Sequence, residues 1–314
     1  MGGPTLRPTP FRGDPDVDAL HAFFQPERQF AGDTRWSFGT SLKSAYVNSF
    51  EFLNQPPLVQ LWRDAEGSVQ AVSRMMLADS RWFHLATPAF RNDTVAAAIL
   101  EQADATMNLL TADPSWQTVA YESDVAAGAR LRGAGYEEAG SAEVYMTRSL
   151  GEAIAPVPDP IGCTVRELSV EDPAEVFARG DAQTDAFLED QPRSEVEAWM
   201  TRTLPHQLGY GRPRRQPHVI AIEPNGRVLA FADVFFDLEN RIAEFEPVGT
   251  RPRLQRRGLA KAVLTRGLEH MREAGMQRAV VRTGCDNTAA IAAYASVGFE
   301  AADRLVTYRK ERGR

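Results

Sequence analysis

The sequence predicts an α/β protein of two tandem domains, each a mixed (α+β-type) central β-sheet flanked by helices. Three observations support this fold class. The chain has 314 residues, more than one compact core usually holds. Residues 151–162 include three prolines at alternate positions, which exclude a regular helix or a central strand there. The same order of strand, turn and helix signals occurs on both sides of that stretch.

The proline-rich stretch sets the expected domain boundaries. We expect a first domain over residues 1–150, a linker over 151–161 and a second domain over 162–314. The length of each domain is ordinary for an independent hydrophobic core.

The order of elements in the two halves indicates an internal duplication. A strand, turn, strand pattern turns at Gly67 in the first half and at Gly226 in the second, an offset of 159 residues. A short helical run ends at Gly135 and again at Gly298, an offset of 163, and each glycine precedes an aromatic residue. Turn and cap glycines are common, so chance likeness of two α/β domains is the alternative. The matching order favours duplication.

Composition excludes several classes of protein. The fractions of hydrophobic residues, 43%, and charged residues, 25%, are not those of a disordered, collagen-like or coiled-coil chain. A net charge of −7 does not suit nucleic acid or an anionic membrane surface. Two cysteines and five scattered histidines predict neither a disulfide framework nor a metal site. No apolar run nears the roughly 18 residues of a membrane helix, and no signal peptide is apparent, so we expect a cytoplasmic protein.

A basic, glycine-bearing loop in the second half predicts an anion site. A strand over 241–248 leads through this loop into a helix with one apolar face, made by Leu259, Val263, Leu264, Leu268 and Met271. Free amides at the helix start and the helix dipole favour phosphate, and the loop arginines add positive charge. The loop is neither a P-loop nor a dinucleotide fingerprint, because the required glycine and lysine pattern is absent.

Two motifs in order carry a family resemblance. Gln255-x-x-Gly258-x-Ala260 follows a strand, and Asn287-x-x-Ala290-x-x-x-Tyr294-x-x-x-Gly298-Phe299 follows the next helix and strand. The pair resembles the acetyl-CoA signature of the GNAT N-acetyltransferase superfamily. The resemblance implies acetyl-CoA as the cofactor, CoA as the product and no metal.

The resemblance also implies roles for residues of the second half. The tyrosine of the second motif, Tyr294, would protonate the leaving thiolate, and Asn287 would lie near pantetheine. The loop would bind the pyrophosphate, and the strand before it would hold pantetheine and the acetyl group. These cofactor-binding positions are Val248, Gly249, Thr250, Gln255, Arg256, Arg257, Gly258, Leu259 and Ala260.

Two glutamates on the strand before the loop are candidates for the general base. In a regular strand Glu244, Glu246 and Val248 alternate onto one face, so both carboxylates are expected to point into the cleft that holds the thioester. Glu244 lies 11 residues before Gln255, a spacing that resembles family members in which a strand glutamate acts through water. Glu244 is therefore the first choice and Glu246 the second, against the alternative that both are solvated or salt-bridged.

The first half resembles a GNAT domain that has lost its catalytic parts. Its equivalent loop lacks the motif, and Asn92 and Asp93 look like helix N-cap residues that occupy the amides a phosphate would need. Leu131 stands at the tyrosine position. A silent domain of this kind is similar to the arrangement in tandem GNAT proteins such as mycothiol synthase. We expect this half to be non-catalytic, to stabilise the second half and to wall the acceptor site.

The expected acceptor site lies between the first strand of the second half and the acetyl-CoA strand. Charged residues there are Asp181, Glu189, Asp190 and the arginine-rich residues 212–215, whose acids would hold an amine and whose arginines a carboxylate or phosphate. The function expected is transfer of an acetyl group to a primary amine of a small molecule, by a monomer or homodimer. A non-catalytic acyl-CoA-binding or sensing protein is the alternative. A nucleic-acid patch at 251–257 is disfavoured by the acidic whole.

Overall fold

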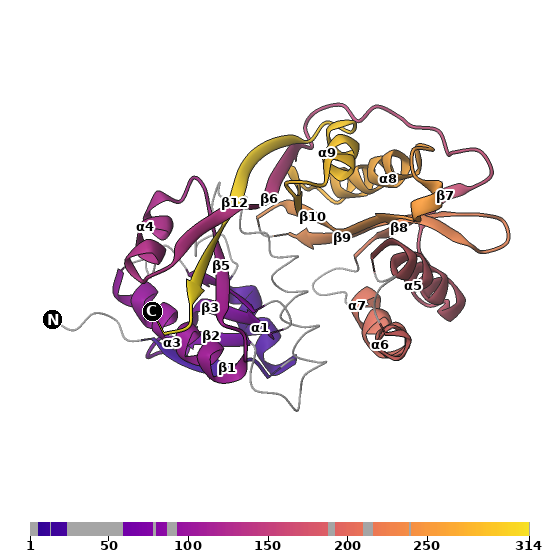
Figure 1. Cartoon of the computed structure of the whole chain (residues 1–314). Coiled ribbons are helices and arrows are strands. Elements are labelled where there is room, and N and C mark those ends of the chain that lie inside the picture. Colours follow the sequence, from indigo (N-terminus) through magenta and orange to yellow (C-terminus); the bar gives the residue numbers. More distant parts are fainter. Residues whose placement is uncertain are drawn as a thin grey trace.

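One continuous mixed sheet with helices on both faces organises the chain (Figure 1). The computed structural model describes residues 6–12, 14–23, 59–77, 80–86, 93–187, 192–209, 216–238 and 240–313. Within these residues the sheet has 12 strands, and the α/β fold class expected from the sequence is confirmed.

The described residues of the first half form five strands, three helices and a long closing strand. In chain order they are β1 (Arg7–Pro10), α1 (Asp14–Phe23), β2 (Val59–Arg63), β3 (Val69–Met76), β4 (Arg81–Ala86), α3 (Asp93–Leu110), β5 (Ser115–Tyr121), α4 (Val125–Gly133) and β6 (Glu137–Ser149).

The second half repeats this order of strands and helices, and its described residues include several helices after the first strand. In chain order the elements are β7 (Thr164–Glu167), α5 (Pro173–Phe187), α6 (Arg193–Ala198), a π-helical turn (Trp199–Thr203), α7 (Leu204–Gly209), β8 (His218–Ile222), β9 (Val228–Asp237), β10 (Ile242–Thr250), a 3₁₀ turn (Pro252–Leu254), α8 (Leu259–Glu273), β11 (Arg278–Gly284), α9 (Thr288–Ala295) and β12 (Glu300–Glu311).

Equivalent positions in the two halves have the same local geometry. The turn residues Gly67 and Gly226 both adopt left-handed φ, 84° and 86°, a conformation that favours glycine. The N-cap side chain of Asp124 accepts a hydrogen bond from the third amide of α4, and that of Asn287 does the same on α9. This repetition of local structure supports the duplication.

The two halves exchange their last strands. The sheet order is β1-β2-β3-β4-β5-β12-β6-β11-β10-β9-β8-β7, so β12 lies between β5 and β6, and β6 lies beside β11. In Figure 1 these two long strands form the arch that joins the halves. The linker at 151–161 stays a prediction of where one domain ends along the chain and the next begins. In the sheet, however, each half is completed by a strand of the other.

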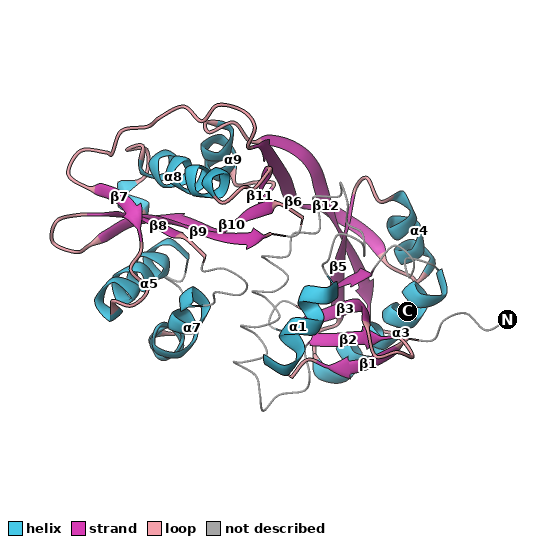
Figure 2. Ribbon diagram, turned by 180° about the vertical axis from the view of Figure 1, so that it is seen from behind, coloured by secondary structure: helices cyan, strands magenta, loops and turns pink. Residues whose placement is uncertain are grey.

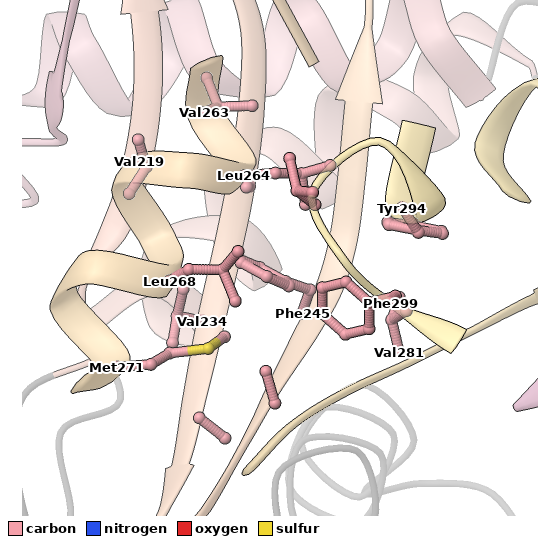
Figure 3. Packing of buried hydrophobic residues seen from close by; sticks show 14 of the residues in the cluster. Val219, Val234, Phe245, Val263, Leu264, Leu268, Met271, Val281, Tyr294 and Phe299 are labelled. Atoms are coloured by element: carbon pink, nitrogen blue, oxygen red, sulfur yellow. The ribbon is translucent and has the colours of Figure 1, made fainter. Parts of the chain in front are cut away.

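Helices cover the second-half sheet on both faces (Figure 2). On one face, α8 and α9 pack against the sheet around Phe245, and the apolar residues expected on α8 are buried there (Figure 3). On the other face, α5 and α7 bury a second cluster that includes Ile220 and Phe231. Burial of one apolar stripe of each helix is the main stabilising contribution of these layers.

A small buried cluster joins the halves where the exchanged strands meet. Tyr121 of β5, Tyr145 of β6 and Leu305 of β12 pack with Ile242 of β10 and Val280 of β11. The two tyrosine rings meet edge to face at 6.0 Å between centroids. Five strands from both halves therefore share one patch of core.

Shortening Leu305 tests whether the halves unfold as one unit. Leu305 is 4% exposed, so Leu305→Ala removes buried atoms from the shared cluster and is expected to cost about 2–5 kcal/mol of the free energy of unfolding. Urea unfolding followed by tryptophan fluorescence reports mainly on the first half, which has the buried Trp62, Trp82 and Trp116, once Trp199 of the second half is replaced by Phe in every variant. Circular dichroism reports on both halves.

Both signals are expected to shift together in this variant. Leu109→Ala, at a leucine that is 81% exposed, is the matched control and should change the unfolding free energy little. A shift seen by one probe alone would show that the halves unfold independently.

Candidate active site

Strands β10 and β11 run side by side for three residues and then part. Their parallel pairing ends at Glu244 and Val280, although β10 continues to Thr250 and β11 to Gly284, all within the described residues. β10 stays paired with β9, and β11 stays paired with β6. The divergence exposes backbone N–H and C=O groups along both inner edges, and such groups bind an extended ligand in the way a neighbouring strand would.

A β-bulge in β10 changes which face its residues occupy. Phe245 pairs with Val234 and Val248 with Ala232, so the two residues between them on β10, Glu246 and Pro247, oppose one residue of β9. The alternation expected for Glu244, Glu246 and Val248 is therefore wrong. Glu244 lies on the face opposite α8, Val248 packs against the core on the α8 side, and Glu246 is in the bulge between them.

The loop after β10 presents the start of α8 to solvent. Gln255, Arg256, Arg257 and Gly258 are exposed, and Arg256 and Gly258 have left-handed φ values of 65° and 81°. Helix α8 has neither a side-chain cap nor an acidic residue in its first turn. The first amides of α8 have no intrahelical acceptor. The positive end of the helix dipole lies at these amides, and the loop arginines add positive charge beside it. This geometry suits a phosphate.

Helix α5 holds the far end of β10 in place. The buried guanidinium of Arg251 donates to Asp185, to Asp181 at 2.5 Å and to the Val228 carbonyl oxygen at 2.7 Å. Asp181, expected from the sequence to meet an amine, is thus paired with Arg251. A Cβ on the buried Gly249 would lie 2.4 Å from the Phe231 ring, so only glycine fits between β10 and that ring without a shift.

A fully buried cluster of ionisable side chains lies against the Phe231 ring. Arg179 of α5 lies 3.7 Å from the ring centroid and binds Asp233 of β9 at 2.5 Å. His218 of β8 is 3.3 Å from the same carboxylate. Burial by itself would raise the pKa of Asp233, but Arg179 and His218 hold that pKa well below its usual range. The sequence signal for this cluster is weak, because arginine on a helix normally indicates a solvated face.

Tyr294 lies on α9 in the core on the α8 side, 6% exposed and 5.9 Å from the Phe299 ring between centroids (Figure 3). Burial and the nearby charge of Glu246 raise the pKa of its phenol above the ordinary value. The Tyr294 phenol is therefore protonated and uncharged at neutral pH. Asn287, at the start of the same helix, uses its side-chain oxygen to cap α9.

A charged group that the sequence analysis missed lies beside Glu244. Arg282 of β11 is 3.9 Å from Glu244 and 3.9 Å from Glu143 of β6. Burial lowers the pKa of Arg282, but Tyr121, Glu244, Glu143 and Glu246 outweigh it, and the pKa is raised. The sequence signal that could have identified Arg282 is a charged residue at an alternate position in an otherwise apolar strand. Its partner on β6 was not predictable, because it comes from the other half.

The elements around this site match a known protein family. Residues 184–299, which span the divergent strands, the loop and both motif helices, match the acetyltransferase (GNAT) family. This stretch of the second half is therefore similar to a GNAT domain. The predicted resemblance is confirmed.

Several curated relatives that match this chain carry one name. Proteins called mycothiol acetyltransferase from Streptomyces coelicolor, Arthrobacter sp. and Streptomyces bingchenggensis are 35%, 31% and 29% identical over 28%, 39% and 53% of this chain. The matched segments span 29%, 44% and 53% of the length of those relatives.

Two solved structures share the fold over nearly the whole chain. A tandem GNAT protein from the clavulanic acid biosynthesis pathway superimposes with a TM-score of 0.68 at 18% identity, covering 98% of this chain and 99% of that one. A GCN5-related N-acetyltransferase from Sphaerobacter thermophilus gives 0.60 at 19% identity, covering 98% and 95%. The tandem GNAT fold expected from the sequence is therefore confirmed.

The structure describes only some of the other residues that the sequence analysis singled out. Leu131, at the tyrosine position of the first half, is buried in that half's core. Asn92, Glu189, Asp190 and residues 212–215 lie outside the described residues, as does the side chain of Asp93. In the described ranges, no group of three His, Cys, Asp or Glu side chains is arranged to hold a metal ion. The helices of the described part include none that is long and apolar enough to span a membrane.

Replacing Gly249 tests the tight packing beneath β10. In Gly249→Ala the new methyl group meets the Phe231 ring, so the free energy of unfolding is expected to fall by about 1–3 kcal/mol. Gly151→Ala is the control, because its Cβ would meet nothing closer than 3.6 Å. Urea unfolding measures both changes. Equal, small effects in the two variants would contradict the close approach of Phe231 to Gly249.

Proposed function

We propose that residues 162–314 transfer an acetyl group from acetyl-CoA to a primary amine of a small molecule. The observation that carries the proposal is the parting of β10 and β11 directly beside the uncapped start of α8. An extended chain with a pyrophosphate at one end and a thioester at the other fits that combination of sheet edges and amides. The family match and the tandem fold support the same function.

The residues present fit the parts of acetyl-CoA. The loop from Gln255 through Arg256, Arg257, Gly258, Leu259 and Ala260 would bind the pyrophosphate, with charge from the two exposed arginines. The free edge of β10 at Val248, Gly249 and Thr250 would bind pantetheine and orient the acetyl group. Asn287 contributes by starting α9 at the point that brings Tyr294 to the site.

Glu244 and Tyr294 would move the two protons of the reaction. Glu244 takes a proton from the acceptor ammonium through a water molecule, and the free amine attacks the thioester carbonyl. Tyr294 would donate its phenolic proton to the sulfur as the C–S bond breaks, so the thiol of CoA would be released. The new amide nitrogen would then lose its remaining extra proton, which would restore the Tyr294 phenol, and the proton held by Glu244 would pass to solvent. The Tyr294 pKa, raised by burial and by Glu246, keeps that proton in place until it is needed. Glu246 is the second candidate for the base.

For the acceptor we propose only a chemical class, a small molecule with a primary amine. The relatives named mycothiol acetyltransferases support a small-molecule acceptor. The first half, which has Leu131 in place of the tyrosine, would be non-catalytic and would complete the site through its exchanged strand.

Calorimetric titration of acetyl-CoA tests where the cofactor binds. One site per chain is expected in the wild type and none in Gly258→Glu, because glutamate adds negative charge at the exposed turn and strains the left-handed φ of 81°. Two sites would contradict the assignment of the first half as non-catalytic. No binding by the wild type would remove the acetyltransferase proposal.

Replacing Tyr294 separates catalysis from acyl-CoA sensing. Tyr294→Phe removes the proton donor and is expected to lower kcat about 10²–10⁴-fold with unchanged affinity for acetyl-CoA. A thiol-release assay with a panel of primary amines measures kcat, and calorimetry measures the affinity. If the wild type binds acetyl-CoA but acetylates no amine in the panel, the sensing alternative is favoured.

A further inference from the structure

The exchanged strand β6 brings a first-half carboxylate to the candidate base. In the pairing of β6 with β11, Tyr145 lies opposite Arg282 and Glu143 lies opposite Gly284. The Arg282 guanidinium is then 3.9 Å from Glu143 on one side and 3.9 Å from Glu244 on the other. Both separations are too long for a hydrogen bond, so the groups interact as charges.

Burial makes a nearby cation important for Glu244. The Glu244 residue is 1% exposed, and a carboxylate that loses its water stays ionised when a nearby positive charge or hydrogen bonds compensate. Arg282 is a cation that the described residues place beside it. A base that is protonated at neutral pH cannot accept a proton from the acceptor ammonium.

Arg282 is shared among several negative or titratable groups. Glu244 and Glu246 approach from β10, Glu143 from β6 and Tyr121 from β5, and all four side chains raise the pKa of the guanidinium. Tyr145 lies opposite Arg282 in the strand pairing, and Asp303 of β12, opposite Tyr145, is hydrogen-bonded to Ser123. Glu143 therefore competes with Glu244 for one positive charge.

We propose that Arg282 is a positioning residue that keeps the Glu244 carboxylate ionised, and that Glu143 of the first half limits how strongly it does so. The inference rests on the proposed function of Glu244 as general base. It gives the first half, which lacks its own motif residues, a direct influence on the chemistry of the second.

The proposal makes variants of the two partners act in opposite directions. Arg282→Gln removes the compensating cation, so the Glu244 pKa rises and the acidic limb of kcat/KM against pH moves to higher pH, by about one to three units. Glu143→Gln removes a like charge and leaves Arg282 more available to Glu244. Its acidic limb therefore moves to lower pH, by a smaller amount.

The pH profiles are measured by thiol release with one primary amine as acceptor throughout, so the titration of the acceptor itself is the same in every variant. Arg282→Lys keeps the charge and should restore the limb close to its wild-type position. Glu138→Gln is the matched control on β6, because Glu138 is exposed and pairs with Arg132 rather than Arg282. A purely structural role would lower activity in the variants without moving the limbs in opposite directions.

A second measurement keeps this inference separate from the proposed function. Carboxyl ¹³C NMR of glutamate-labelled protein, with the Glu244 signal assigned by its loss in Glu244→Gln, gives the Glu244 pKa without any turnover. Opposite shifts of that signal in Arg282→Gln and Glu143→Gln support the proposal. Unchanged or parallel shifts overturn it, whereas absence of acetyl transfer by a wild type that shows the opposite shifts overturns only the proposed function.

Discussion

The divergence of β10 from β11 is the constraint on which the rest of the second half depends. Two neighbouring parallel strands normally satisfy each other's backbone groups, and here they stop doing so after Glu244. A sheet tolerates this only if something fixes the strand that turns away. The bulge at Glu246 and Pro247 starts the departure, since proline has no N–H to give to a ladder. Arg251 then fixes the far end of the strand to α5.

Helix α5 works as the support for this open edge. Its Arg179 is buried against Phe231 and paired with Asp233, and its Asp181 and Asp185 hold Arg251. Burying an ion pair is costly unless it is well hydrogen-bonded, and such pairs fix one arrangement more than they add net stability. The charges on α5 therefore specify where β10 lies, so that the sheet edge keeps its shape when no ligand chain is bound to it.

Sequence patterns correctly predicted the strands, turns and helices that depend on local periodicity. The strand and turn around Gly226, the apolar stripe of α8 and the closing helix with Tyr294 all occur where expected. The prediction that Glu244 and Val248 share a face was wrong, because one extra residue in a strand reverses the alternation after it. Pro247 is the local sign of that irregularity.

Features that depend on distant pairing had no local sign. The approach of Glu143 to Arg282 requires β6 to cross into the other half, and no periodicity in either strand reports that. The burial of Arg179 and the engagement of Asp181 by Arg251 were likewise hidden, because charged helix residues are usually solvated. The sequence thus conveys the part of this site that is carried by motifs, and it does not convey the charged groups around Glu244, the proposed base.

The exchange of closing strands also has a consequence for how the protein is made. β12 is the final strand of the described chain, and it fills the gap beside β5, with contacts such as Lys310 to Asp104 that span 206 residues of sequence. A ribosome releases the first half long before this strand exists. Until then the edge of β5 has no partner, and an unpaired edge invites association with other chains. Completion of the first sheet waits for the synthesis of β12, and until then the newly made chain keeps an edge that favours aggregation.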